Sequence, residues 1–126
     1  MKWLTALVEQ MLETVKNAAR IPVLVGWRPS QTPPSAVIQM KNCEITPLDL
    51  SASKHLVDAS LQVDVWHVSA KSRDEVVEKI LTALEEKRTL FSEELGVFSL
   101  SVEGVADVGD ESGFRKMLLV RVRMVV

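Results

Sequence analysis

The side chains that could do chemistry are few, and the two histidines are the first to consider. His55 and His67 are 12 residues apart around one predicted strand. A continuous strand rises about 3.3 Å per residue and would separate the imidazoles by roughly 40 Å. One subunit therefore cannot bring both to one metal ion. A site made of His67, Asp64 and Cys43 would need three strands to converge, so ordinary strand positions are the favoured interpretation.

The single cysteine offers a thiol without a catalytic setting. A nucleophilic thiol needs a base and an electropositive neighbourhood, and the sequence places no histidine beside Cys43. A small, half-buried strand residue is the favoured interpretation. One cysteine also excludes an intrachain disulfide and an all-thiolate zinc site within one chain.

Clusters of charge point to surfaces rather than to sites. The acidic residues Asp107, Asp110 and Glu111 lack the ligand number and spacing of a calcium loop, so a solvated hairpin turn is favoured. The only basic concentration comes late in the chain and consists of Arg115, Lys116, Arg121 and Arg123. It is a weak basis for nucleic-acid binding, and ion pairing with Glu103 or with another subunit is preferred. The sequence thus predicts no catalytic, cofactor or metal site.

Composition bounds the remaining possibilities. The chain has 126 residues, a net charge of −2 and a hydrophobic fraction of 47%. This length fits one domain over residues 1–126, and the charge gives no overall attraction to nucleic acid or anionic lipid. The N-terminal residues lack the long apolar core of a signal peptide, and no stretch approaches the roughly 20 apolar residues of a membrane span. We expect a soluble, intracellular protein.

Hydrophobic periodicity predicts the elements that position these side chains. A helix of roughly 17 residues opens the chain and stops before Pro22. A capping-box pattern from Ser72 to Glu75 starts a second helix that ends near Lys87, and 89–96 is a connector. Predicted strands cover 23–25, 36–45, 56–69, 97–105 and 117–126. The order predicts an α+β fold, with two helices packed on one face of a mostly antiparallel sheet of four to five strands.

The last two strands predict their own register. Apolar faces match when paired residue numbers sum to an even value. With the turn centred near Glu111, Val102 faces Val120 and Leu100 faces Val122. Ser101 then lies across from Arg121, and Glu103 lies on the diagonal, close enough for an ion pair. The inward side chains of the first of these strands are expected to be Phe98, Leu100 and Val102.

Three features point to protein partners. Trp27 lies beside a stiff loop that contains Pro29, Pro33 and Pro34, and Trp66 lies on a strand face that should be polar. The chain also ends in a strand without a polar tail. Exposed tryptophans and unprotected strand edges are common at interfaces. In the alternative interpretation, Trp66 packs against a loop or helix of its own subunit.

The layout resembles the tail-terminator and tail-completion proteins of long-tailed bacteriophages, the group that includes minor tail protein U. The similarity covers nearly the whole chain by element order. It rests on the N-terminal helix, the Trp27-Arg28-Pro29 to Pro33-Pro34 loop, the Val63-Asp64-Val65-Trp66 strand, the helix ending Ile80-Leu81-Thr82-Ala83-Leu84, and the closing hairpin to Arg121-Val122-Arg123.

The resemblance implies a structural role without catalytic residues. Such proteins form rings, commonly hexameric, that stop growth of the tail tube and join the tail to the head. The implied partners are further copies of the chain, the tail tube protein and a head-completion or connector protein. DNA would only pass through the central channel, and no membrane or cofactor is implied. The implied location is the virion tail, with the host cytoplasm during assembly.

A ring needs one surface patch to meet a different patch on the neighbour, and loops and strand edges can supply both. The expected contact regions are 27–35, 46–54 and 107–113. The candidate contact residues are Trp27, Arg28, Pro33, Asp49, Trp66, Arg121 and Arg123. Acidic side chains in the channel would let DNA slide, and the candidates there are Asp107, Asp110 and Glu111.

Three other functions stay open at this point. A small regulatory or ligand-binding α+β domain would need a pocket with convergent polar groups. A related head-completion or neck protein would have a similar build. A minor enzyme or nuclease would need a constellation of carboxylates or histidines, which the sequence does not offer.

Overall fold

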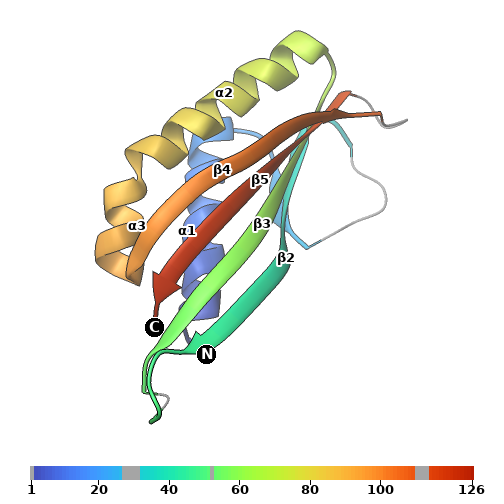
Figure 1. The fold of residues 1–126 in the computed structure, drawn as a ribbon. Coiled ribbons are helices and arrows are strands. Elements are labelled where there is room, and N and C mark those ends of the chain that lie inside the picture. Colours follow the sequence, from blue (N-terminus) through green and yellow to red (C-terminus); the bar gives the residue numbers. More distant parts are fainter. Residues whose placement is uncertain (1, 27–31, 52, 110–113) are drawn as a thin grey trace.

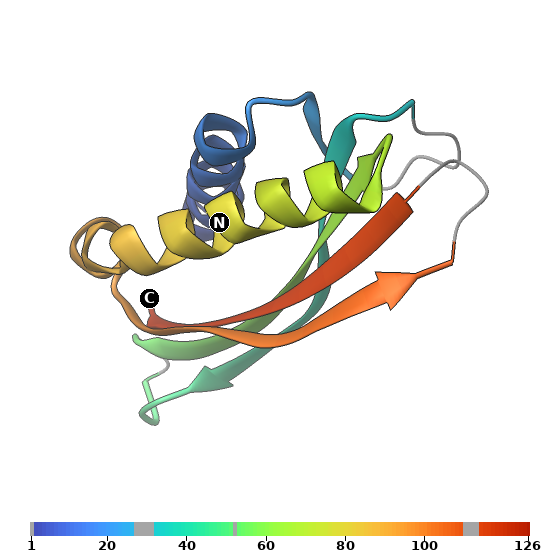
Figure 2. The same cartoon turned by 90° about the horizontal axis from the view of Figure 1, so that it is seen from above.

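The computed structural model describes residues 2–26, 32–51, 53–109 and 114–126. In this part of the chain the helices lie together on one face of a curved sheet, as Figures 1 and 2 show. In chain order the elements are α1 (Lys2–Ala19), β1 (Val23–Val25), β2 (Ser35–Pro47), β3 (His55–His67), α2 (Ala70–Glu86), α3 (Arg88–Leu95), β4 (Val97–Val108) and β5 (Phe114–Val125).

The sheet has five strands in the order β1-β2-β3-β5-β4 among the described residues. The pairs β2–β3, β3–β5 and β5–β4 are antiparallel. The short β1 runs parallel to β2 and pairs only with Ala36–Ile38. The predicted α+β class with a mostly antiparallel sheet is confirmed. Because β1 is so short, most of β2 has a strand on one side only.

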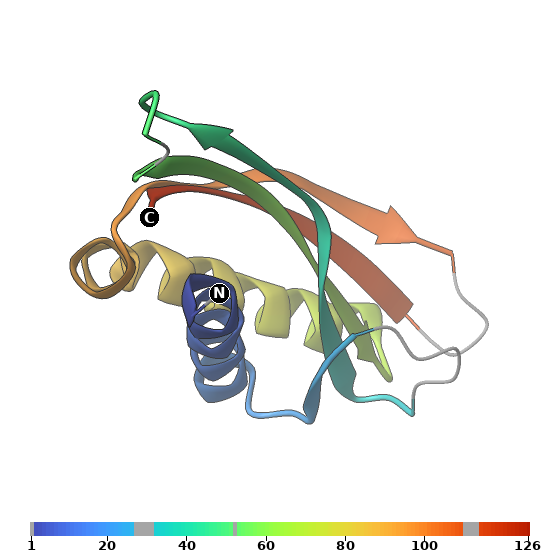
Figure 3. The ribbon, with the colours of Figure 1, turned by 90° about the horizontal axis from the view of Figure 1, so that it is seen from below.

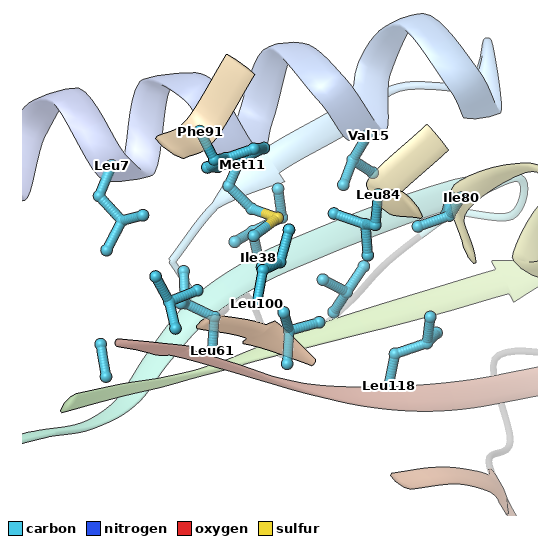
Figure 4. Packing of buried hydrophobic residues seen from close by; sticks show 14 of the residues in the cluster. Leu7, Met11, Val15, Ile38, Leu61, Ile80, Leu84, Phe91, Leu100 and Leu118 are labelled. Atoms are coloured by element: carbon cyan, nitrogen blue, oxygen red, sulfur yellow. The ribbon is translucent and has the colours of Figure 1, made fainter. Parts of the chain in front are cut away.

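The core lies between the helices and the sheet. Leu7, Met11 and Val15 recur every four residues on α1 and are fully buried. They meet side chains of α2 and of the central strands, such as Ile80 and Leu61, in one cluster (Figure 4). Each such side chain contributes about 1.5–3 kcal/mol through burial. This apolar layer determines which face of each strand points to the helices.

The predicted register of the closing hairpin is confirmed. Leu100 pairs with Val122, Ser101 with Arg121 and Val102 with Val120. Val102 faces the helix side as predicted, across from buried Val120, although its side chain is exposed. The inward placement of Phe98 is wrong, because Phe98 is the extra residue at a register shift and its side chain is exposed. The ladder shifts between Val97 and Ser99 and again between Val102 and Gly104. The extra residues at the two shifts, Phe98 and Glu103, interrupt the alternation of faces along β4.

The second helix begins earlier than predicted. Its N-cap is Ser69, whose hydroxyl accepts a hydrogen bond from the Ser72 amide at 3.1 Å. Ser72 therefore lies in the first turn of α2, and the capping-box assignment of Ser72 to Glu75 is wrong. Serine is a preferred N-cap residue at either position. Because β3 ends at His67, only a short turn precedes α2, and the earlier serine becomes the cap.

The segment predicted to be a connector contains a third helix. Helix α3 follows α2 after Lys87 and buries Phe91 in the core. It ends at Gly96, whose backbone is left-handed with φ 74°. A Cβ atom at this position would lie 3.0 Å from the Val125 carbonyl oxygen. The fold thus has three helices on one face within the described residues, instead of the two that were expected.

Candidate assembly surface

The face of the sheet opposite the helices carries a buried ion pair at the end where β2 begins. Arg115 of β5 donates from Nε and Nη2 to Oδ1 of Asp64 on β3, at 2.9 and 2.7 Å. The Gln62 amide donates to Asp64 Oδ2 at 2.8 Å. Although this face was expected to be solvated, Asp64 is 0% exposed. The carboxylate is stable there because charged and amide donors replace its water.

Trp66 belongs to the same buried group. Trp66 is 1% exposed, and the guanidinium of Arg115 lies 5.1 Å from the centroid of its ring. A cation over an indole face is a favourable contact, more so when water is excluded. The expectation of an exposed Trp66 is wrong, and packing within its own subunit is the arrangement seen. Its role as a contact residue stays a prediction.

A second ion pair joins the same two strands at the other end of this face. Arg121 donates from Nε and Nη2 to the two oxygens of Asp58, at 2.9 and 2.6 Å. Its Nη1 also lies 3.8 Å from Glu103, so the predicted diagonal pair is present. Arg123 Nε is 3.8 Å from Asp58, and its guanidinium lies 5.5 Å from the Phe98 ring. The candidate contact residues Arg121 and Arg123 thus sit together in one charged cluster.

The electrostatics of this cluster follow from its hydrogen bonds. The bonds from Arg121 hold the pKa of Asp58 below its usual range, against the opposing effect of burial. The same bonds, followed by the charge of Asp58, raise the pKa of Arg121. Both groups therefore stay charged at neutral pH. Together with Asn42, Glu44, Ser60 and Glu103 they line a shallow hollow of about 400 Å³ on the open face.

The acidic residue Asp107, a channel candidate, lies on the helix side of β4 and is already paired. Its carboxylate is 3.2 Å from Arg73 of α2 and 3.2 Å from Lys116 of β5. The Lys116 amine also lies 2.8 Å from Asp74. Hydrogen bonds from Lys116 and then Arg73 lower the pKa of Asp74, and the bond to Asp74 raises the pKa of Lys116. Asp107 is thus one member of a four-residue cluster of balanced charge.

The turn between β2 and β3 presents apolar side chains on a polar frame. Asp49 accepts hydrogen bonds from the Ser51 hydroxyl at 2.7 Å and from the Ser53 hydroxyl at 2.9 Å. The Leu48 amide donates to the Lys54 carbonyl at 2.9 Å. Figure 3 shows this hairpin extending away from the helices, and both Leu48 and Leu50 are exposed on it. The sequence predicted Asp49 as the contact residue here and did not predict the two leucines. Apolar residues between turn-forming residues could have indicated them.

Other sequence candidates are placed as follows. Pro33 is half-buried and joined to Pro34 by a cis peptide bond. Trp27, Arg28, Asp110 and Glu111 lie outside the described residues. The histidines His55 and His67 stand at opposite ends of β3. Within 2–26, 32–51, 53–109 and 114–126, no three His, Cys, Asp or Glu side chains gather as metal ligands.

Cys43 is half-buried on β2 and free. Burial, and then the negative charge of Asp58, raise the pKa of its thiol above the ordinary value. A thiol with a raised pKa is less reactive at neutral pH, because the thiolate is the nucleophile. Cys43 therefore has the properties of a small strand residue.

The hollows found on the described surface are open to solvent. One of about 660 Å³ lies between α1 and α2 and is lined by Asn17, Ala18, Arg20, Glu75, Glu78, Lys79, Thr82, Ala83 and Glu86. Ligand pockets are mostly enclosed and apolar with a few placed polar groups, and this groove is lined mainly by charged side chains. Among the described helices, none is both long enough and apolar enough to span a bilayer.

Comparison with known proteins yields a structural likeness. A chain in the solved structure of the virion of a native gene transfer agent (GTA) particle matches 94% of this chain and 92% of its own length. The TM-score is 0.54 and the sequence identity is 12%. The two chains therefore share a fold. No protein-family model and no curated protein matches the sequence.

Proposed function

We propose that the protein is a non-enzymatic structural component of a phage-like virion. The observation that carries this proposal is the likeness of nearly the whole fold to a chain of a gene transfer agent virion. The independent resemblance of the sequence layout to tail-terminator proteins points in the same direction. Neither likeness depends on a catalytic group. The charged side chains described above form ion pairs with one another.

Within the virion, we assign the chain to a ring at the end of the tail tube. The ring would stop growth of the tube and present the surface that joins tail to head. Its partners would be further copies of the chain, the tube protein and a head-completion or connector protein, with DNA passing through the channel. Asp107, Asp110 and Glu111 remain the proposed channel residues. Because Asp107 is paired with two cations, its carboxylate contributes less to a negative potential in the channel.

The protomer has the kind of surface that a ring requires. Heterologous contacts join two different patches, so each subunit must carry both. The described sheet has two different unpaired edges, β4 and most of β2. Exposed apolar side chains accompany them, at Phe98 and Val105 on β4 and at Leu48 and Leu50 on the hairpin. A small-molecule domain would have no need of these features.

Tube capping tests the assignment. Tail tubes of the parent particle are incubated with the protein, then imaged by negative-stain electron microscopy while free tube subunits are added. The assignment predicts density at one tube end and arrested elongation. An equal amount of heat-denatured protein is the control. Tubes that keep growing with bare ends would overturn the terminator role, and binding only to isolated heads would instead identify a head-completion or neck protein.

A further inference from the structure

The two unpaired edges of the sheet run in directions that allow them to meet. The strands β2, β3, β5 and β4 alternate in direction, because each neighbouring pair is antiparallel. A second copy placed beside β4 in the same orientation would bring its β2 alongside. That β2 would run antiparallel to β4, which is the more stable arrangement for two strands. Among the described residues, β1 covers β2 no further than Ile38.

The ladders place the residues of both edges in common rows across the sheet. Asn42 of β2 lies in the row of Ser60, Arg121 and Ser101. In the same way Cys43 shares a row with Leu100, and Met40 shares a row with Val102. Copies related without a shift along the strands would therefore set Asn42 of one beside Ser101 of the other.

Both edges carry bulges, and the bulge of β2 lies within one row of the second bulge of β4. The register shifts between Met40 and Asn42 on β2, leaving Lys41 as the extra residue. It shifts between Val102 and Gly104 on β4, leaving Glu103. A bulge with a charged side chain protects an edge from indiscriminate pairing. Here the two extra residues have opposite charges and stand within one row of each other.

The charges and the apolar side chains match in the unshifted arrangement. The Lys41 side chain is exposed and makes no hydrogen bond or ion pair within the part of the chain that the structure describes. Glu103 is exposed, with Arg121 at 3.8 Å. On the helix side, exposed Val102 lies in the row of half-buried Met40. Pairing the edges would cover this valine and bring Lys41 to Glu103, as complementary interfaces require.

We propose that β4 of one copy pairs antiparallel with residues 39–45 of β2 in the next copy, with Lys41 of that copy beside Glu103. The occupant of each edge is thus a second copy of this chain. The contact is heterologous, so repetition closes a ring when the rotation between copies divides a full turn. The inference rests on the proposed ring and specifies how its subunits meet.

A disulfide between copies tests the row assignment directly. Asn42→Cys and Ser101→Cys are combined in a Cys43→Ser background. Within one protomer, β3 and β5 separate the two positions by about three strand spacings, or roughly 14 Å, whereas a disulfide needs Cα atoms about 4.4–6.8 Å apart. Oxidation should give covalent dimers and a ladder of larger species on a denaturing gel. The matched control, Asn42→Cys with Ala106→Cys, lies four rows out of step and should give none.

Charge reversal provides a second readout. Lys41→Glu and Glu103→Lys should each weaken association by about fivefold, since each puts like charges side by side. The double variant should restore it. Val102→Lys should weaken association more strongly, because a charge replaces the exposed apolar side chain that pairing would cover. Val68→Lys is its matched control, since that valine is exposed but lies outside both edges. Unchanged melting would show that each monomer is folded.

The outcomes separate the two proposals. Cross-linking of the in-row pair together with charge-swap rescue supports edge pairing. Oligomers that form without the cross-link and ignore both reversals overturn edge pairing and leave the ring in place. A protein that stays monomeric at every concentration and ignores tail tubes overturns the ring, and edge pairing with it.

Discussion

Two ion pairs of the same build lie on the open face of the sheet and differ mainly in burial. Both join an aspartate of β3 to an arginine of β5 that is two residues from the directly opposite position. Asp64 and Arg115 have side chains 0% and 15% exposed. Asp58 and Arg121 are 22% and 44% exposed. The same chemical motif is thus placed in two different dielectric surroundings.

The difference shows which end of the face holds the fold and which end is available to a neighbour. A buried pair gains little net stability but is costly to break, because the remaining charge has lost its water. An exposed pair contributes about 0–1 kcal/mol and can exchange partners. We infer that the Asp64 end fixes the geometry of β3 and β5, while the Asp58 end keeps charges that an assembling copy can use.

The largest effect is expected for Trp66→Ala, which empties the space beneath Arg115. Removing a buried tryptophan side chain should lower the free energy of unfolding by about 3–5 kcal/mol. Urea denaturation followed by circular dichroism measures the loss. Val68→Ala is the control, because that side chain is exposed and should change stability by less than about 0.5 kcal/mol. A stable Trp66→Ala protein with impaired assembly would return Trp66 to the interface.

Arg115→Met should follow closely, with a loss of about 3 kcal/mol. The methionine keeps much of the side-chain volume but removes both Arg115 hydrogen bonds from the buried Asp64 carboxylate, which keeps the bond from the Gln62 amide. Equilibrium urea unfolding at pH 7 provides the number. Adding Asp64→Leu should recover part of the loss, because it removes the stranded charge. A loss below about 1 kcal/mol in Arg115→Met would contradict the contrast between the two pairs.

Arg121→Met, the matched change at the exposed pair, should cost less than about 1 kcal/mol. Its effect should shrink further in 1 M salt, where screening acts within about 3 Å. The same unfolding experiment at low and high salt checks both statements. If Arg121→Met destabilises as strongly as Arg115→Met, burial does not distinguish the two pairs.

The smallest effect concerns pH. The pKa of Asp58 is lowered in the folded protein from its usual 3.8. The unfolded chain therefore takes up a proton first as the solution is acidified, so the stabilisation is present above about pH 4 and is lost as pH falls through the folded pKa. Unfolding midpoints between pH 6 and pH 3 should fall less steeply for Asp58→Asn than for the unchanged protein. Equal slopes would show that the pair does not favour the charged form.

Much of the sheet could be predicted from the sequence, because strand parity and opposite charges restrict the register. The pairing of Ser101 with Arg121 and the nearby position of Glu103 followed from parity together with the predicted position of the turn. Phe98 was misplaced because nothing in the local sequence specifies a bulge. Helix α3 was missed because the residue between α2 and α3, Lys87, is neither a proline nor a glycine and gives no signal of a break. Gly96 and the apolar Phe91 nevertheless fit a short helix that ends at Gly96.

The charged surface was less predictable. Asp58 shares its strand face with Asp64, yet sequence reasoning paired Arg121 only with Glu103. A residue pattern indicates the face on which a side chain lies, but not what covers that face. For this reason the burial of Asp64 and Trp66 could not be derived, and the expectation of an exposed tryptophan failed.

The most direct test of the proposed ring is the mass of the protein by light scattering over a concentration series, alone and with tail tubes. We expect a closed oligomer whose mass stops increasing at a fixed multiple of 14.0 kDa, or capture of the protein at tube ends. A strict monomer that ignores the tubes would contradict the assembly account. A ligand-dependent rise in its melting temperature would then favour a small binding domain.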